Sequence, residues 1–440
     1  MVDPEGWAMR YRELFGDREF RALFIADAMS ITGSYLARVA VAGLVFHRTG
    51  SATLTALAFA VSYAPYLLSP WLSSLADLFP RRMLLILCDL ARAVCIGLIL
   101  VPGLALPIVM ALLFLEATWR IPWGAARLAL LTDILSPEAF PAGNALIASV
   151  RQTLQVGGFA VDGVVVALIG VRPTLAFDAF TFLLSAAIVV VAVRRRAAPW
   201  RTRRVAVTSG APSPARGGEQ PARESDRATD VRPGTWVSTV EGVRSVVRNP
   251  KMVQLFALLG LGPAMAVITE GLAVPFAADL GGGLRLAGLI MAAPPLGTVI
   301  GLFALGRLPM DVQRRLIAPL SLGTGLAVVL AGLAASLPAA NLFVLTLLFV
   351  CGGCVAYIST IQSEISMMVE SSMRGRVFGL ANAVMQISQG LAIVLAGAVA
   401  GTGRLTFAIA IIAAALSVLT VVALRFRPRR TAAWSPTAAA

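Results

Sequence analysis

The segment SSLADLFPRR at residues 73–82 decides how this chain folds, because it is a short charged turn between two long apolar blocks and it has a counterpart later in the chain. The counterpart is GRLPMDVQRR at residues 306–315, in which the leucine and the paired arginines stand in the same frame. A second correspondence joins RQTLQ at residues 151–155 to MQISQ at residues 385–389. We therefore predict an internal duplication, with two halves of one architecture.

The apolar residues around these turns form about twelve blocks, each close to the ~20 residues that a helix needs to cross a bilayer. The chain is 58% hydrophobic and 14% charged, against roughly 45–50% and about 25% in soluble domains, which argues against a soluble fold. Backbone groups in lipid must be satisfied within the segment, which favours helices. We predict an all-α integral membrane protein with about 12 transmembrane helices in two pseudo-symmetric six-helix bundles. The expected spans are 20–46, 52–76, 82–101, 104–126, 144–169, 173–193, 252–276, 284–306, 316–335, 341–366, 377–400 and 405–425.

The spans divide the chain into five regions. Residues 194–251 interrupt the membrane pattern with a stretch rich in Arg, Pro, Gly and Ser, which predicts a largely disordered cytoplasmic linker. The two bundles then cover residues 20–193 and 252–425. A cytoplasmic lead at 1–19 and a tail at 426–440 complete the chain, and the lead lacks the features of a removable signal peptide.

The net charge of +14 has a topological explanation. Almost all basic residues outside the apolar cores, Arg127 among them, lie in loops that share one side, and the opposite loops hold only Arg48, Arg172, Arg285 and Arg404. The positive-inside rule then predicts cytoplasmic termini in a plasma or inner membrane. It also makes anionic lipid, not nucleic acid, the expected partner of the basic surface.

Three segments together resemble the major facilitator superfamily, and within it the branch of enterobactin-exporter-like and macrolide-efflux-like proteins. Residues 73–82 are similar to the superfamily loop motif G-x-L-x-D-R-x-G-R-R, keeping Leu75, Asp77, Arg81 and Arg82. The connections PEAFPAGNAL at 137–146 and MRGRVF at 373–378 are similar to those that precede the fifth and eleventh helices of that branch. The resemblance covers nearly the whole chain and implies a transporter, not an enzyme.

The chain also departs from the superfamily patterns. Ser73 and Pro80 replace glycines and Leu78 replaces an arginine in the loop motif. In the fifth helix, GFAVDG at 158–163 stands where the resemblance would place the antiporter motif G-P-x-x-G-G, but it lacks the proline and one glycine. This loss favours a facilitator or an importer of a small polar metabolite as the alternative to a proton antiporter.

Charged residues at the cytoplasmic helix ends are the predicted gating group. Asp77 ends the second span, and Arg374 and Arg376 begin the eleventh, so an ion pair between the halves would form when that side closes and break when it opens. The resemblance assigns this gating role to Asp77; Arg81 and Arg82 accompany it in the motif. A pair that only fixes topology at the surface is the alternative.

Ionisable residues inside the spans are the second set of candidates, because a charge near the bilayer centre costs on the order of 2.5–3.5 kcal/mol or more. Glu116 and Arg120 are four residues apart and should pair directly, and RIPWG at 120–124 loosely resembles the superfamily motif R-x-x-Q-G, whose arginine is linked to proton transfer. Asp27 and Arg38 share a helix face but lie too far apart for a direct pair. The proton-coupling or substrate candidates are Asp27, Arg38, Glu116, Arg120, Arg151, Asp162 and Glu270, with Asp27 and Glu270 first as protonation sites.

Each of these charges also has a structural alternative. Arg151 belongs to a polar stripe with Gln152 and Gln155 that lines a cavity or binds a neighbouring backbone, and Glu270 follows an expected helix break at Gly262-Pro263. Asp89 and Arg92 should form a structural pair, and Glu364 should face a loop.

Several chemistries are excluded by residue content. Lys251 is the sole lysine and stands outside any Walker-A pattern, so the chain cannot hydrolyse ATP by that route. His47 is the sole histidine, which removes a His-paired triad and a His-rich metal site. The cysteines at 88, 95, 351 and 354 are expected to pack as small apolar residues. We expect no metal and no cofactor.

The sequence therefore predicts a secondary active transporter that works by alternating access. Its substrate class comes from the resemblance alone: a hydrophobic or amphipathic small molecule such as a drug, an antibiotic or a siderophore, exported at the expense of a proton gradient by a monomer. The alternatives are the facilitator or importer and, from another class, a non-transporting receptor or lipid-flipping protein.

Overall fold

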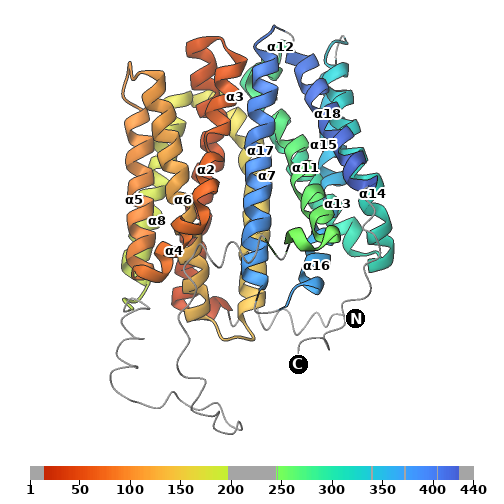
Figure 1. The fold of residues 1–440 in the computed structure, drawn as a ribbon. Helices are drawn as coiled ribbons and strands as arrows, with labels where there is room; N and C mark the ends of the chain where they lie inside the picture. The colour runs from red at the N-terminus through yellow and green to blue at the C-terminus, as the bar shows by residue number, and fades with distance from the viewer. Residues whose placement is uncertain are drawn as a thin grey trace.

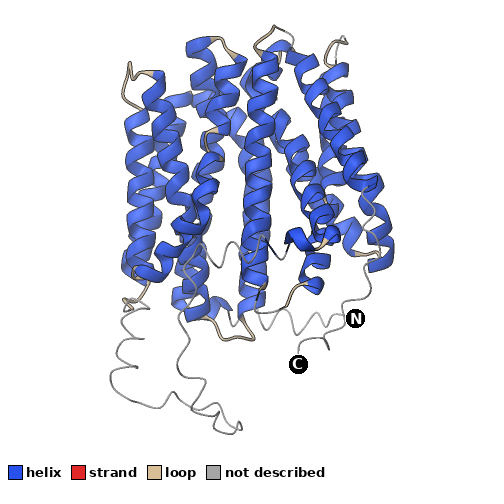
Figure 2. Ribbon diagram, in the orientation of Figure 1, coloured by secondary structure: helices blue, strands red, loops and turns tan. Residues whose placement is uncertain are grey.

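The computed structural model describes residues 14–196, 244, 246–337, 340–370, 373–403 and 405–425. Within these ranges every regular element is a helix (Figure 2). Most of the expected linker, the first 13 residues and the tail after 425 lie outside the described residues.

The first half of the chain folds into a series of helices. They are α2 (Arg18–Thr49), α3 (Ala52–Ala60), the 3₁₀ helix η1 (Ala64–Leu68), α4 (Ser69–Leu78), α5 (Arg81–Ile99), α6 (Leu106–Ile134), α7 (Phe140–Ile169) and α8 (Val171–Ala192). The second half repeats the series: α11 (Pro250–Gly271), α12 (Ala273–Asp279), α13 (Gly283–Gly306), α14 (Met310–Ala334), α15 (Asn341–Val355), α16 (Tyr357–Met368), α17 (Arg374–Ala400) and α18 (Leu405–Arg425). We call the side on which α2 begins and α18 ends the terminal side, drawn at the bottom of Figure 1, and the opposite side the far side.

Among the described residues, eleven helical segments are long and apolar enough to cross a membrane. The one expected span outside that set is α5, whose 19 residues carry four charges: Arg81, Arg82, Asp89 and Arg92. The chain is therefore a multi-pass membrane protein of the predicted all-α class.

Both halves begin with the same type of helix cap. The Asp17 carboxylate accepts hydrogen bonds from the backbone N–H groups of Glu19 and Phe20, and the Asn249 side chain accepts from those of Lys251 and Met252. Such caps satisfy donors that have no partner within the helix. They fix the start of α2 and α11 at corresponding places in the two halves.

The second span is not one continuous helix as expected. It breaks into α3, η1 and α4, with Pro65 in the first turn of η1 and Pro70 in the first turn of α4. Proline removes a backbone donor and clashes with the preceding turn, so each ring starts a new segment. The break lies within the span where Phe59, Ser62 and Tyr63 line the cavity described below.

The break predicted at Gly262-Pro263 is wrong, because α11 continues through Pro263 and ends at Gly271. Side chains from neighbouring helices bind the carbonyls on either side of Leu259, the residue whose carbonyl loses the N–H donor that Pro263 lacks. The Tyr357 hydroxyl donates to the Leu258 carbonyl at 2.9 Å, and the Ser388 hydroxyl donates to the Gly260 carbonyl at 2.9 Å. Neighbouring helices commonly re-satisfy a proline-disturbed membrane helix in this way.

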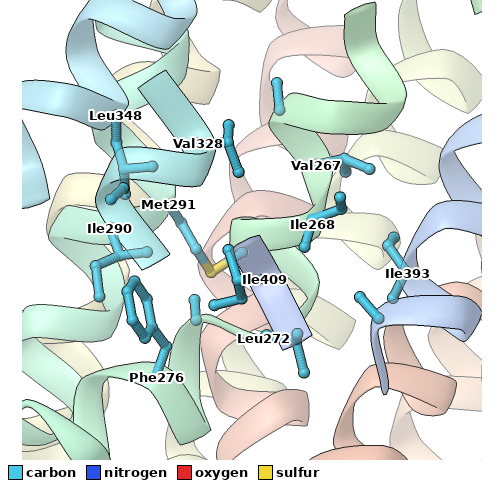
Figure 3. Close-up of a cluster of buried hydrophobic side chains, with 14 of the residues drawn as sticks. Val267, Ile268, Leu272, Phe276, Ile290, Met291, Val328, Leu348, Ile393 and Ile409 are labelled. Atoms are coloured by element: carbon cyan, nitrogen blue, oxygen red, sulfur yellow. The ribbon is translucent and has the colours of Figure 1, made fainter. Parts of the chain in front are cut away.

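Three hydrophobic clusters show how the halves are joined. On the far side, one cluster contains residues of both halves, including Val39, Ala56 and Phe159 with Ile268 and Ile393; Figure 3 shows its second-half members. On the terminal side, the cluster around Leu85 and Trp123 is made of first-half residues. The cluster around Leu259 and Tyr357 is made of second-half residues. The described part of the chain is thus closed on the far side, with no shared cluster on the terminal side.

Small residues allow the halves to approach closely on the far side. A Cβ added to Gly163 of α7 would lie 2.8 Å from the Cα of Gly288 in α13. The Thr53 hydroxyl of α3 donates to the Gly397 carbonyl of α17 at 2.7 Å. Backbones that approach this closely are typical of membrane helix contacts. These two crossings hold the far side shut.

Candidate functional site

A cavity in the first half lies between α2, α3, α5, α6 and α8. Its lining combines apolar and aromatic side chains with charged ones, and the polar members are Ser34, Arg38, Ser62, Tyr63, Glu116, Arg120 and Asp178. Three predicted candidates, Arg38, Glu116 and Arg120, therefore meet in one cavity. Ligand sites typically have this composition, with a few polar groups on mostly apolar walls.

Arg38 lies among aromatic rings. Its guanidinium carbon is 5.6 Å from the ring centre of Tyr35, 5.3 Å from that of Phe59 and 5.7 Å from that of Phe159. A cation over an aromatic face is attracted by the ring quadrupole. Among the described residues, no carboxylate forms an ion pair with Arg38, which sets it apart from the other arginines inside the spans of this half.

Arg92 of α5 ties three helices together. Its Nε donates to Glu116 Oε1 of α6 at 3.0 Å, and its Nη1 and Nη2 donate to the Ser30 and Ser34 hydroxyls of α2 at 2.9 Å each. The guanidinium also lies 4.0 Å from the ring centre of Phe182 in α8. The fixed fork of guanidinium donors suits such a site.

The predicted pair of Glu116 and Arg120 is present, with Arg120 Nη2 donating to Glu116 Oε2 at 2.8 Å. Glu116 is thus shared between Arg92 and Arg120. The second predicted pair is looser, because Arg92 Nη1 lies 3.7 Å from Asp89 Oδ1 while Asp89 Oδ2 accepts from the Ser185 hydroxyl at 2.7 Å.

Asp27 lies between two arginines on the terminal side of the cavity. Its Oδ2 is 3.5 Å from Arg151 Nε of α7, and its Oδ1 is 3.8 Å from Arg127 Nε of α6. The expectation that Arg127 lies in a loop is wrong, because α6 runs on to Ile134 and leaves Arg127 buried. The expected span ended at 126 because the sequence shows a charge there but not its partner on another helix. Asp27 Oδ1 and Arg127 Nε have no hydrogen-bond partner, so the ion pairs are loose.

Asp162 of α7 is fully buried and contacts the backbone of α2. Its Oδ2 accepts a hydrogen bond from the Val39 N–H at 2.8 Å, while its Oδ1 has no partner. Val39 directly follows Arg38, and Gly163 directly follows Asp162 at the crossing with α13. Asp162 therefore links the helix that carries Arg38 to the contact between the halves.

Glu270 of α11 is the predicted proton or substrate candidate of the second half, and it is not among the residues that line this cavity. It is partly exposed and makes no ion pair or hydrogen bond with any residue that the structure describes.

The predicted gating residues lie on the terminal side but on separate halves. Arg81 pairs with Asp133 and donates to the Ala129 carbonyl at 2.8 Å, and Arg82 donates to the Val190 carbonyl at 2.6 Å. Arg374 Nε donates to the Val369 carbonyl at 3.2 Å, and Arg376 Nη1 contacts the Met373 sulfur at 3.4 Å. Asp77 is exposed and has no ion pair in the described part of the chain.

Glu364 is not the loop-facing charge that was expected. It is buried in α16, where Arg314 Nε lies 2.9 Å from its Oε1 and Lys251 Nζ lies 3.4 Å from its Oε2. Sequence reasoning also missed the rings of Phe59 and Phe159 around Arg38. A single aromatic residue in an apolar span carries no signal that separates a cavity wall from packing.

No group of three or more His, Cys, Asp and Glu side chains able to hold a metal ion is found among the described residues.

Comparisons with known proteins bear on the fold and the family. The model of the Major Facilitator Superfamily matches residues 261–440. The nucleoside transporter NupG superposes with a TM-score of 0.68 at 11% identity, covering 92% of this chain and 98% of that one. The chain therefore has the fold of these transporters, and the family model matches its second half.

Two further solved structures have the same fold as this chain. A peptide transporter, POT, in complex with sulfate gives a TM-score of 0.66 at 13% identity, covering 93% of this chain and 94% of that one. A bacterial homologue of the human lysosomal transporter Spinster, inward-facing and unoccupied, gives 0.64 at 15% identity, covering 92% and 95%. No curated protein matches the chain. At these identities the likeness concerns the fold.

Proposed function

We propose that the chain is a major facilitator superfamily transporter of the enterobactin-exporter-like and macrolide-efflux-like branch. It is a proton-coupled exporter of a hydrophobic or amphipathic small molecule, such as a drug, an antibiotic or a siderophore. It acts as a monomer in a plasma or inner membrane, with both termini in the cytoplasm. The terminal side is then the cytoplasmic side, and the cavity loads from it.

The observation that carries the proposal is the loose placement of Asp27 between Arg127 and Arg151. A buried carboxylate needs a paired cation or a proton, and this one has two arginines on different helices at 3.5 and 3.8 Å. A proton on Asp27 would release both arginines. Because α6 and α7 carry those arginines, the proton would change how three helices are held together.

The cavity supports the same proposal. It combines aromatic and apolar walls with a few charges, which suits an amphipathic molecule better than a small sugar-like solute. Asp162 and Glu270 are further buried or partly buried carboxyls without a cation in contact, and either can serve as a second proton site.

The experiment is a drug-accumulation assay in cells that overproduce the transporter, with and without a protonophore. We expect lower accumulation than in empty cells, and the difference should vanish when the gradient is dissipated. Asp27→Asn should abolish the difference while the protein remains in the membrane, whereas Glu138→Gln, on the exposed loop before α7, should not. Export that continues without the gradient would rule out proton coupling.

A facilitator or importer is the second candidate. The observation that favours it is Asp162. This residue lies in the segment that departs from the antiporter motif, and its carboxylate accepts a hydrogen bond from the Val39 N–H. In that case a polar substrate should enter de-energised vesicles down its own gradient, at a rate unaffected by Asp27→Asn.

A further inference from the structure

Two arginines inside the first half, Arg127 of α6 and Arg151 of α7, have more hydrogen-bond donors than the surrounding protein has acceptors for them. A guanidinium carries five N–H donors, yet neither arginine donates a hydrogen bond to any residue that the structure describes. Each has one charged partner, the Asp27 carboxylate, at 3.8 and 3.5 Å. Arg92, which is also buried, donates three hydrogen bonds to its neighbours. The donors of Arg127 and Arg151 therefore remain available to a ligand.

The same group carries an excess of positive charge. Two arginines face one carboxylate, which leaves one cation unbalanced. A buried charge without a partner is strongly destabilising, and within a membrane such groups mark ligand or ion sites. A proton on Asp27, as the proposed function requires, would leave both arginines unbalanced. That step becomes favourable when an anion from outside the chain accompanies the proton.

The packing around the two arginines limits the size of such an anion. Ala26, Ala126 and Ile147, which are one to four residues from the three charges along their helices, are buried in the first-half cluster of the terminal side. The Arg127 side chain is only 10% exposed, whereas that of Arg151 is 37% exposed. An ion therefore reaches the pair by way of Arg151, and the apolar surroundings strengthen its attraction to both cations.

We propose that Arg127 and Arg151 form a binding site for a small monovalent anion such as chloride, which takes the place of the Asp27 carboxylate when Asp27 is protonated. The proposal rests on the proposed function in one respect, that Asp27 takes up a proton. The anion then holds α6 to α7 while α2 loses its contact with both. Because the proton and the anion bind together, each strengthens the binding of the other.

The other ionisable groups along this part of α2 do not contact Asp27. Arg92 of α5 binds Ser30, three residues beyond Asp27, and Asp89 lies 3.7 Å from Arg92. Asp178 of α8 lies against α2 six residues beyond Asp27. In the described part of the chain, Arg127 and Arg151 are thus the ion-pair partners that a proton on Asp27 would release.

The test measures thermal unfolding of the purified full chain in detergent while chloride, bromide or nitrate replaces gluconate at constant ionic strength. A ligand that binds the folded state raises the unfolding temperature in a saturable way. Half of the shift should require at least about fivefold less chloride at about pH 6 than at about pH 8, since protonated Asp27 no longer competes. Benzoate, which is monovalent but larger, should give no saturable shift.

Four substitutions assign the response. Asp27→Asn, which resembles the protonated acid, should bind chloride about tenfold more tightly at the higher pH and lose the pH dependence. Arg127→Gln and Arg151→Gln should each abolish the saturable shift. Arg285→Gln, the same change at an exposed position near the start of α13, should not. The double variant Asp27→Asn/Arg127→Gln removes one charge of each sign and should also abolish the shift, which covers the case in which Arg127→Gln alone unfolds.

Four results would overturn the proposal: no saturable shift with any of the three small anions, a shift that persists in both arginine variants, binding that is equal or weaker at the lower pH, or chloride binding unchanged by Asp27→Asn. A saturable shift with benzoate alone would also overturn it and would assign the arginines to an acidic substrate.

The failure of this proposal is separable from that of the proposed function. Chloride binding that follows these expectations, together with export that continues without the proton gradient, retains the anion site and rejects proton-driven export. Gradient-driven export that is equal in chloride and in gluconate, with no saturable shift, retains the export and rejects the anion site.

Discussion

Arg314 pairs with Glu364 at 2.9 Å, and this pair occupies in the second half the place that the pair of Arg81 and Asp133 occupies in the first. In each half an arginine from the first turns of the third span meets a carboxylate from the terminal end of the fourth. The repeat of the paired arginines in the sequence therefore corresponds to a repeat of ion pairs. Each pair fastens one half internally on the side where the halves are not joined.

Glu364→Gln should lower the stability of the second half. The Glu364 side chain is only 6% exposed and serves both Arg314 and Lys251, which are 44% and 48% exposed. Loss of a buried partner is costly, but water still reaches the two cations, so we expect a loss of about 1–2 kcal/mol. Thermal unfolding in detergent measures it. Asp311→Asn is the control, because Asp311 is 87% exposed and 3.8 Å from Arg314, and an equal loss in both variants would contradict the prediction.

Arg92 and Glu116 should behave as a coupled pair. Arg92→Gln leaves Glu116 with Arg120 at 2.8 Å, and Glu116→Gln leaves Arg92 with only the looser contact to Asp89 at 3.7 Å. Breaking a buried ion pair costs on the order of 3–5 kcal/mol, so Glu116→Gln should be the more costly single change. The double variant removes both charges, so its loss should be smaller than the sum of the single losses by about 1–3 kcal/mol. Unfolding titrations of the three variants give this coupling energy. Additive losses would mean that the 3.0 Å contact contributes nothing to stability.

The helical class and the duplication were predictable because they depend on local properties. About twenty apolar residues specify a membrane helix wherever they occur, and the paired arginines at 81–82 and 314–315 mark the same turn twice. Contacts within one helix were also predictable, since four residues separate Glu116 from Arg120 and place both on one face.

Contacts between helices were not predictable from one sequence. Nothing in the spacing joins Arg127 to Asp27 or Glu364 to Arg314, since each pair connects helices that are far apart in the chain. The prediction of a helix break was wrong for a related reason. Gly262-Pro263 weakens a helix locally, but hydroxyls of Tyr357 and Ser388 on other helices bind carbonyls next to the one that Pro263 frees.

Asp77→Asn should lower transport without lowering stability. Asp77 is exposed on the terminal side and has no ion pair in the described part of the chain, so its charge contributes little to this conformation. If it pairs with Arg374 when the terminal side closes, the neutral variant should lose at least about tenfold in flux, since a charge-assisted contact is worth about 1.5–3 kcal/mol. Flux and thermal unfolding are measured together, and Asp311→Asn in the corresponding turn of the second half is the control. Normal flux in Asp77→Asn would argue against a gate at this residue. So would a loss of flux accompanied by a lowered unfolding temperature, because the loss would then follow from instability.

Gly163→Ala should open the far side. Its added Cβ would lie 2.5 Å from the Leu284 carbonyl oxygen and 2.8 Å from the Gly288 Cα, and both atoms belong to the backbone of the other half. Cβ atoms do not tolerate such distances, so α7 and α13 must separate. Thr53→Cys, on the same side, provides the measurement: maleimide should label it several-fold faster in the Gly163→Ala background, corrected for labelling of the same background without Thr53→Cys. Gly157→Ala is the matched control on the same helix, because a Cβ there meets nothing within 4 Å. Equal labelling in the two alanine variants would show that the crossing of Gly163 and Gly288 does not hold the far side closed.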